Sequence, residues 1–107
     1  MRAAISEYRR YLDRDKKGLL SDAVNRSLAY ALESDHQYTA AAPIYAALAG
    51  KFDRESSAEM LYAQARCLRA ANRPAEAQQA LRRIADEYGE TSYAQRARVD
   101  LAELTAQ

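Results

Sequence analysis

Arginine, tyrosine and glutamate residues recur at helical spacing in two parts of the chain. Arg26, Tyr30 and Glu33 follow one another at intervals of four and three residues, and a second set begins with Glu59 and Tyr62. Residues three and four apart lie on one face of an α-helix. Guanidinium groups pair with carboxylates through parallel hydrogen bonds, and tyrosine offers rigid contact area with a polar tip. This chemistry suits non-covalent capture of an acidic peptide. The candidate partner-binding residues are Arg26, Tyr30, Glu33, Glu59, Tyr62, Arg66, Arg69 and Arg98.

The glutamates in these sets support a second interpretation. Glu33 and Glu59 can neutralise the arginines within the helix rows, which would leave a solvated face without a partner. The sequence leaves both interpretations open.

Residues that usually carry catalysis or bind metals are sparse. His36 is the only histidine, and a metal site or acid–base pair would need a second group beside it. Cys67 is the only cysteine, which excludes an intrachain disulfide, and its apolar neighbours predict a buried side chain rather than a reactive thiol. The three glycines are scattered and form no phosphate-binding loop. We therefore expect a protein that is not an enzyme and holds no metal or cofactor.

Composition favours helix along the whole chain. Its 107 residues include 24 alanines but only 3 glycines and 2 prolines, and alanine is the best helix former. The net charge of +1 gives no steering toward nucleic acid or anionic membranes, and the interspersed acids oppose nucleic-acid binding by the arginines. No apolar run approaches the ~18 residues of a membrane span. We expect neither nucleic-acid binding nor membrane insertion by this segment.

Hydrophobic periodicity and turn residues predict six helices joined by short turns. Short connections make helices that are neighbours in sequence pack antiparallel. The predicted N-terminal caps are Thr39, Ser56 or Ser57, and Thr91 or Ser92. The predicted helices cover about 2–14, 20–33, 39–51, 57–71, 74–88 and 93–105.

One pattern of apolar residues occurs twice. Ala29 and Ala65 are 36 residues apart, and so are Ala41 and Ala77. Small residues at such positions let paired helices approach closely. A repeat of this length, written as two amphipathic helices, is typical of a helical solenoid. The copies consist of Leu28, Ala29, Leu32, Tyr38, Ala41, Tyr45 and Leu48, and of Ala65, Leu68, Asn72, Ala77, Leu81 and Ile84.

These residues resemble the tetratricopeptide repeat (TPR) family. The resemblance implies an all-α, right-handed solenoid of antiparallel helix pairs in a single domain, 1–107. The implied units are the second half of a preceding repeat with its turn (1–18), two repeats (19–54 and 55–89) and a terminal capping helix (90–107). The 36-residue spacing departs from the family's usual 34, and Gln64 stands at a usually apolar site.

The resemblance also implies a function. First helices of successive TPR repeats line a concave groove, so the candidate residues should face that groove and bind a protein or peptide partner. Tyr30 and Ala63 stand where the carboxylate-clamp subgroup carries asparagine, so we do not expect a true clamp. The alternative is a structural or oligomerisation module that caps or extends a longer repeat array. In that case Tyr8, Tyr11 and Leu12 of the first helix would mediate self-association, as a homo-oligomer or within the array.

A narrower resemblance concerns the segments 62–68, 77–88 and 92–95. They are similar to bacterial envelope TPR proteins, including the ancillary subunit of the inner-membrane translocon. Many of those proteins carry an upstream membrane or lipid anchor. The resemblance thus favours a bacterial protein in the periplasm, or one anchored through a segment upstream of this chain, over a cytoplasmic one.

Overall fold

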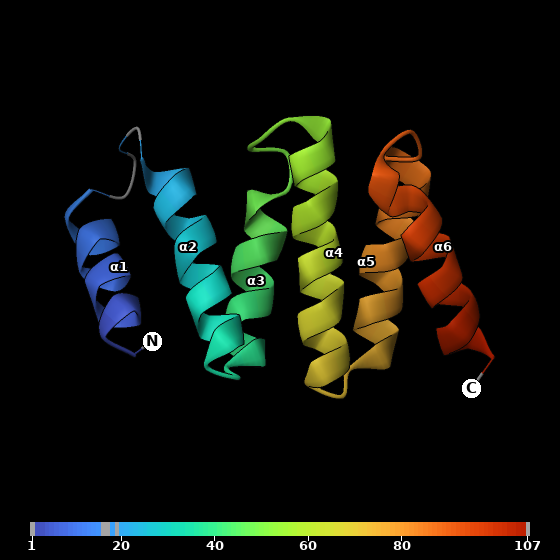
Figure 1. The fold of residues 1–107 in the computed structure, drawn as a ribbon, viewed down its shortest axis with the longest axis horizontal. Coiled ribbons are helices and arrows are strands. Elements are labelled where there is room, and N and C mark those ends of the chain that lie inside the picture. The colour runs from blue at the N-terminus through green and yellow to red at the C-terminus, as the bar shows by residue number, and fades with distance from the viewer. Residues whose placement is uncertain (1, 16–17, 19, 107) are drawn as a thin grey trace.

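Six α-helices, packed in the order of the sequence, make up the described part of the chain (Figure 1). The computed structural model describes residues 2–15, 18 and 20–106, and within these residues it contains no β-strand. The helices are α1 (Arg2–Arg14), α2 (Ser21–Ser34), α3 (Tyr38–Leu48), α4 (Arg54–Ala70), α5 (Pro74–Glu87) and α6 (Ser92–Thr105). The predicted all-α class and the number of helices are confirmed for this part.

Each helix packs against its neighbours in sequence, and the chain direction alternates from one helix to the next (Figure 1). The domain measures 44 × 27 × 16 Å, with α1 and α6 at opposite ends of the long axis. Of the described helices, none combines the length and the apolar character that crossing a membrane requires.

The first helices of the helix pairs do not form a uniform row. α6 packs directly against α4, whereas the main packing partners of α2 are α1 and α3. α2 and α4 are joined instead by side chains. Tyr45 of α3 donates a hydrogen bond to Glu33 of α2, and Arg66 of α4 pairs with the same carboxylate. Side chains of α2, α3 and α4 line one open cavity.

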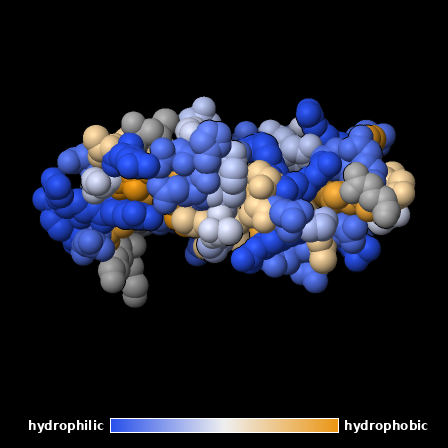
Figure 2. All heavy atoms as spheres, turned by 90° about the horizontal axis from the view of Figure 1, so that it is seen from below, coloured by the Kyte–Doolittle hydropathy of each residue, from blue (hydrophilic) through white to orange (hydrophobic). Residues whose placement is uncertain are grey.

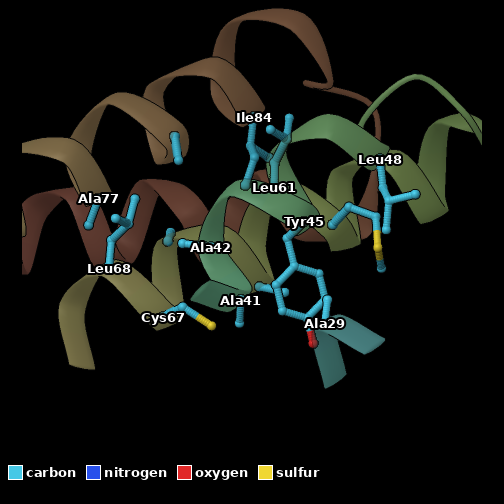
Figure 3. Packing of buried hydrophobic residues seen from close by; sticks show 14 of the residues in the cluster. Ala29, Ala41, Ala42, Tyr45, Leu48, Leu61, Cys67, Leu68, Ala77 and Ile84 are labelled. Atoms are coloured by element: carbon cyan, nitrogen blue, oxygen red, sulfur yellow. The ribbon is translucent and has the colours of Figure 1, made fainter. Parts of the chain in front are cut away.

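The core contains the alanines that the repeat pattern placed at helix crossings. Ala29, Ala41, Ala65 and Ala77 are all buried, and Figure 3 shows Ala29, Ala41 and Ala77 among the packed side chains. Because alanine is small, the backbones of α2 and α3, and of α4 and α5, can approach closely. Cys67 is 0% exposed, so its prediction as a buried small side chain is confirmed.

The turns of the two helix pairs form the same hydrogen bonds. Gln37 N donates to Leu32 O, and Arg73 N donates to Leu68 O, each at 2.8 Å. This six-to-one bond is the Schellman motif, which satisfies free carbonyl groups at a helix C-terminus. Both ends of the bond are shifted by 36 residues between the pairs, so the repeat that was seen in sequence also exists in the backbone.

Capping of α4 differs from the prediction. Asp53 precedes the helix, and its Oδ1 accepts a hydrogen bond from Ser56 N at 2.7 Å. The predicted caps Ser56 and Ser57 were therefore wrong. Ser57 is buried instead, where its hydroxyl accepts from Gly50 N at 2.9 Å and donates to Phe52 O at 3.2 Å.

The other two predicted caps also form no side-chain cap. Thr39 is inside α3, which begins at Tyr38. Thr91 precedes α6, but its hydroxyl donates to Tyr88 O at 2.7 Å. The backbone N–H of Ser92 donates to the carboxylate of Glu55 at 3.0 Å. A residue of α4 thus satisfies the N-terminus of α6 and links the two helices.

Candidate protein-binding groove

An open groove of about 610 Å³ lies between α2 and α4. Arg26 and Tyr30 come from α2, and Glu59 and Arg66 come from α4. These four candidates, which sequence spacing placed on helix faces, therefore line one cavity. We call it the α2–α4 groove.

Apolar side chains form most of the remaining surface of the α2–α4 groove. Ala31, Met60 and Ala63 are buried at its base, and the ring of Tyr45 completes the base from α3. Tyr30 is 64% exposed, which is unusual for so large a side chain. The groove thus combines a floor of small side chains with an accessible aromatic ring.

A network of three side chains crosses between α2 and α4. Arg66 binds the carboxylate of Glu33 through both Nε and Nη2, with 2.9 Å from Nη2 to Oε1. Tyr45 OH donates to the same Oε1 at 2.9 Å. Burial raises the pKa of the Glu33 carboxyl group, but the hydrogen bonds from Arg66 and Tyr45 outweigh burial, so this pKa lies below its ordinary value of 4.5. The guanidinium of Arg66 is therefore already paired within the domain.

A second groove, of about 460 Å³, lies between α4 and α6. Tyr62 OH donates to Asp100, and Arg96 Nε donates to Tyr62 OH at 3.1 Å. Arg69 lies 3.8 Å from Asp100 and 3.9 Å from Glu103. Burial and the hydrogen bond to Asp100 raise the pKa of the Tyr62 hydroxyl. These contacts occupy the polar groups of the α4–α6 groove with one another.

Arg26 and Glu59 are less constrained. The guanidinium of Arg26 lies over the ring of Phe52, 5.4 Å from its centroid. Within the described residues, no carboxylate lies within ion-pair distance of Arg26. Glu59 Oε2 accepts from Tyr93 OH at 3.2 Å. The α2–α4 groove thus has a cation on one wall and an anion on the other.

The structure brings together most of the predicted partner-binding residues, in two grooves rather than one. Arg26, Tyr30 and Glu59 line the α2–α4 groove, Tyr62 and Arg69 line the α4–α6 groove, and Arg66 lines both. Glu33 lines neither groove but an adjacent hollow that it shares with Tyr30 and Arg66, where it accepts a hydrogen bond from Arg66. Arg98 lines neither of these grooves, and its guanidinium lies near Gly89 in the turn between α5 and α6.

Sequence reasoning missed several groove residues. Tyr93, Arg96 and Asp100 come from the edge of α6 that faces α4. The 36-residue repeat instead pointed to Arg98, the position equivalent to Tyr62. Two neighbouring helices touch along the edges that they turn toward each other. The residue of α6 that contacts a given residue of α4 is therefore not the one that lies 36 positions later in the sequence. The 3- and 4-residue spacing of Tyr93, Arg96 and Asp100 was the available signal.

The predicted self-association residues occupy three environments. Tyr8 is half-buried and lines the α2–α4 groove. Leu12 is half-buried against the core. Tyr11 is also half-buried, and its hydroxyl lies 3.5 Å from Asp15 Oδ2. Tyr8 is therefore a groove residue that sequence reasoning had assigned to another role.

The groups considered for metal binding or catalysis lie apart from the grooves. His36 is exposed, and its Nδ1 lies 2.7 Å from Tyr38 OH. In the described ranges, no three histidine, cysteine or acidic side chains are grouped as metal ligands would be. Burial, followed by the nearby charge of Glu33, raises the pKa of the Cys67 thiol to about 12, which keeps it protonated at neutral pH.

Comparison of the chain with protein-family models, with curated proteins and with solved structures found no match. The functional conclusion therefore depends on the shape of the grooves and on the charges that line them.

Proposed function

We propose that this chain is a non-catalytic protein-interaction module of the tetratricopeptide type, which binds a peptide segment of a protein partner in the α2–α4 groove. The observation that carries this proposal is the groove itself, about 610 Å³ in volume and lined largely by tyrosine, methionine and alanine. Concave sites with apolar walls and a few polar groups are the usual form of binding sites.

The repeat supports the architecture within this proposal. Alanines that are 36 residues apart in the sequence are buried in the core, and hydrogen bonds that are 36 residues apart form in the turns. Stacked helix pairs of this kind form a solenoid, and solenoids commonly bind partners on an extended inner surface. We take the helix pairs to form a right-handed solenoid and α6 to be its capping helix. The exposed polar residues of α6, including Gln95, Arg98 and Glu103, suit a helix that ends a core.

The internal ion pairs modify the expectation of an acidic partner. Arg66 and Arg69 already interact with carboxylates of the domain. An acidic peptide would have to compete with Glu33 and Asp100 for them. Of the arginines in the α2–α4 groove, Arg26 is therefore the more accessible contact for a carboxylate.

Peptide selection followed by mapping tests the proposal. Peptides of 12 residues displayed on phage would be selected against the folded chain, and binders would be titrated into ¹⁵N-labelled protein. We expect amide shifts at Tyr30, Met60 and Ala63, and weaker binding to a Tyr30→Ala variant. Arg82→Ala, on the exposed face of α5, is the control and should bind normally. Shifts confined to α5 would contradict the proposal.

A second candidate is the oligomerisation module. The observation that favours it is that α1 packs mainly against α2, and leaves Tyr8, Tyr11 and Leu12 half-buried. Light scattering on size-exclusion fractions would test it over a range of concentrations. A dimer that Leu12→Ser dissociates supports this candidate, and a monomer at every concentration contradicts it.

A further inference from the structure

We infer that the α2–α4 groove selects peptides that carry both charges beside an apolar side chain: an acidic residue that pairs with Arg26 of α2 and a basic residue that pairs with Glu59 of α4. This inference rests on the proposed function and specifies the chemistry of the partner. It differs from the general expectation of an acidic peptide, because it requires both charges and assigns each to one wall of the groove.

The apolar side chain follows from the base of the groove. Ala31 and Ala63 are each 3% exposed and present only methyl groups, so a partner atom can come close to the helices. Met60 is flexible and adapts to side chains of different shape. The exposed ring of Tyr30 can close over the inserted group.

The requirement for two opposite charges follows from which polar groups of the groove remain free. The Nε–H and Nη2–H groups of Arg66 both donate hydrogen bonds to the carboxylate of Glu33. Arg26 is held by its contact with the Phe52 ring, which leaves the guanidinium edge free to pair with a carboxylate.

Glu59 supplies the opposite charge on the opposite wall. Its Oε2 accepts from Tyr93, and no hydrogen bond within the described residues involves its Oε1. Arg26 and Glu59 do not pair with each other, although both line the groove. A peptide that presents an acid to Arg26 and a base to Glu59 satisfies both, whereas a peptide with two acids or two bases places like charges together on one wall.

Single charge reversals test the inference. Phage-displayed 12-residue peptides would be selected against the wild-type chain and against the variants Arg26→Glu and Glu59→Arg. We expect an apolar residue with one acid and one base in the wild-type pool, with bases alone in the Arg26→Glu pool, and with acids alone in the Glu59→Arg pool. Each wild-type peptide should bind either variant about fivefold more weakly, since an exposed ion pair contributes up to about fivefold in Kd.

Two controls separate this inference from the proposed function. Arg82→Glu changes an exposed charge on α5 and should leave the selected pair of charges unchanged. Circular dichroism verifies that both groove variants are folded. Peptides whose NMR shifts map to the groove but whose charges do not change with the variant would overturn this inference and support the proposed function. Peptides that map outside the groove would overturn both.

Discussion

His36 and Asn72 adopt the same left-handed backbone conformation, with φ of 60° and 61°, at positions 36 residues apart. Each ends the turn after the first helix of a pair, within the six-to-one hydrogen bond described above. Glycine is usual at such a position because it has no Cβ, and asparagine is the next best tolerated residue. The chain therefore forms the same turn twice without glycine, and at both positions a residue with a Cβ holds the left-handed conformation.

The first prediction concerns this turn. Asn72→Ala should lower the free energy of unfolding by about 1 kcal/mol, because alanine gains no local hydrogen bond that offsets the left-handed conformation. Urea denaturation would measure it. Asn72→Gly is the matched control and should be close to neutral, since glycine adopts this φ freely. A loss for glycine as large as that for alanine would contradict this account of the turn.

Sequence reasoning predicted the helices well because apolar periodicity and turn residues marked most of the ends. Its errors concerned helix caps, at side chains that could form more than one hydrogen bond. Ser57 looked like a cap, but the tight turn at Gly50 brings its hydroxyl inside the domain, and Asp53 caps α4 instead. The start of α6 depends on Glu55, which lies 37 residues earlier in the chain. No local pattern reveals such a contact.

The candidate site was predictable only in part, because contacts between different helices leave no local pattern in the sequence. Spacing alone placed Arg26 and Tyr30 on one face of a helix, and the structure shows both in the groove. Spacing could not show that Arg66 is paired with Glu33, because the two lie on different helices. Nor could it show that Tyr45, from a third helix, donates to the same carboxylate.

The second prediction concerns the helix crossings. Ala41→Leu and Ala77→Leu should each destabilise the protein by roughly 1–3 kcal/mol through overpacking, because both alanines are 0% exposed. Chemical denaturation would show lower midpoints for both. Ala75→Leu is the control on the exposed face of α5 and should change stability little. Unchanged midpoints for Ala41→Leu and Ala77→Leu would contradict the crossing assignment.

The third prediction concerns Cys67. Its thiol is fully buried and has a pKa raised to about 12, so it should react slowly with iodoacetamide at pH 8 in the folded protein. Reaction should become fast in 6 M guanidinium chloride, where burial is lost. Mass spectrometry of the alkylated chain measures both rates. Equal rates in the two conditions would show that the thiol is accessible in the folded state.

The last prediction concerns the link between Glu33 and Arg66. Glu33→Gln removes the charge that both Arg66 and Tyr45 contact, and should lower stability at pH 7 by about 1 kcal/mol, a modest value because the arginine is about half exposed. The folded-state pKa of Glu33 lies below its ordinary value of 4.5. The stability that its charge contributes is therefore present above pH 4.5, and it is lost as pH falls through the lower, folded-state pKa.

The Glu33→Gln variant lacks this titrating group, so the difference in stability between it and the wild type should shrink below pH 4.5. Urea denaturation of both proteins between pH 3 and 7 measures the difference. Glu76→Gln is the control, because Glu76 pairs with Arg73 at 3.6 Å on an exposed surface, and this variant should lose little stability at any pH. A difference for Glu33→Gln that stays constant down to pH 3 would show that the carboxylate charge does not hold α2 to α4, and that Arg66 is free to bind a partner.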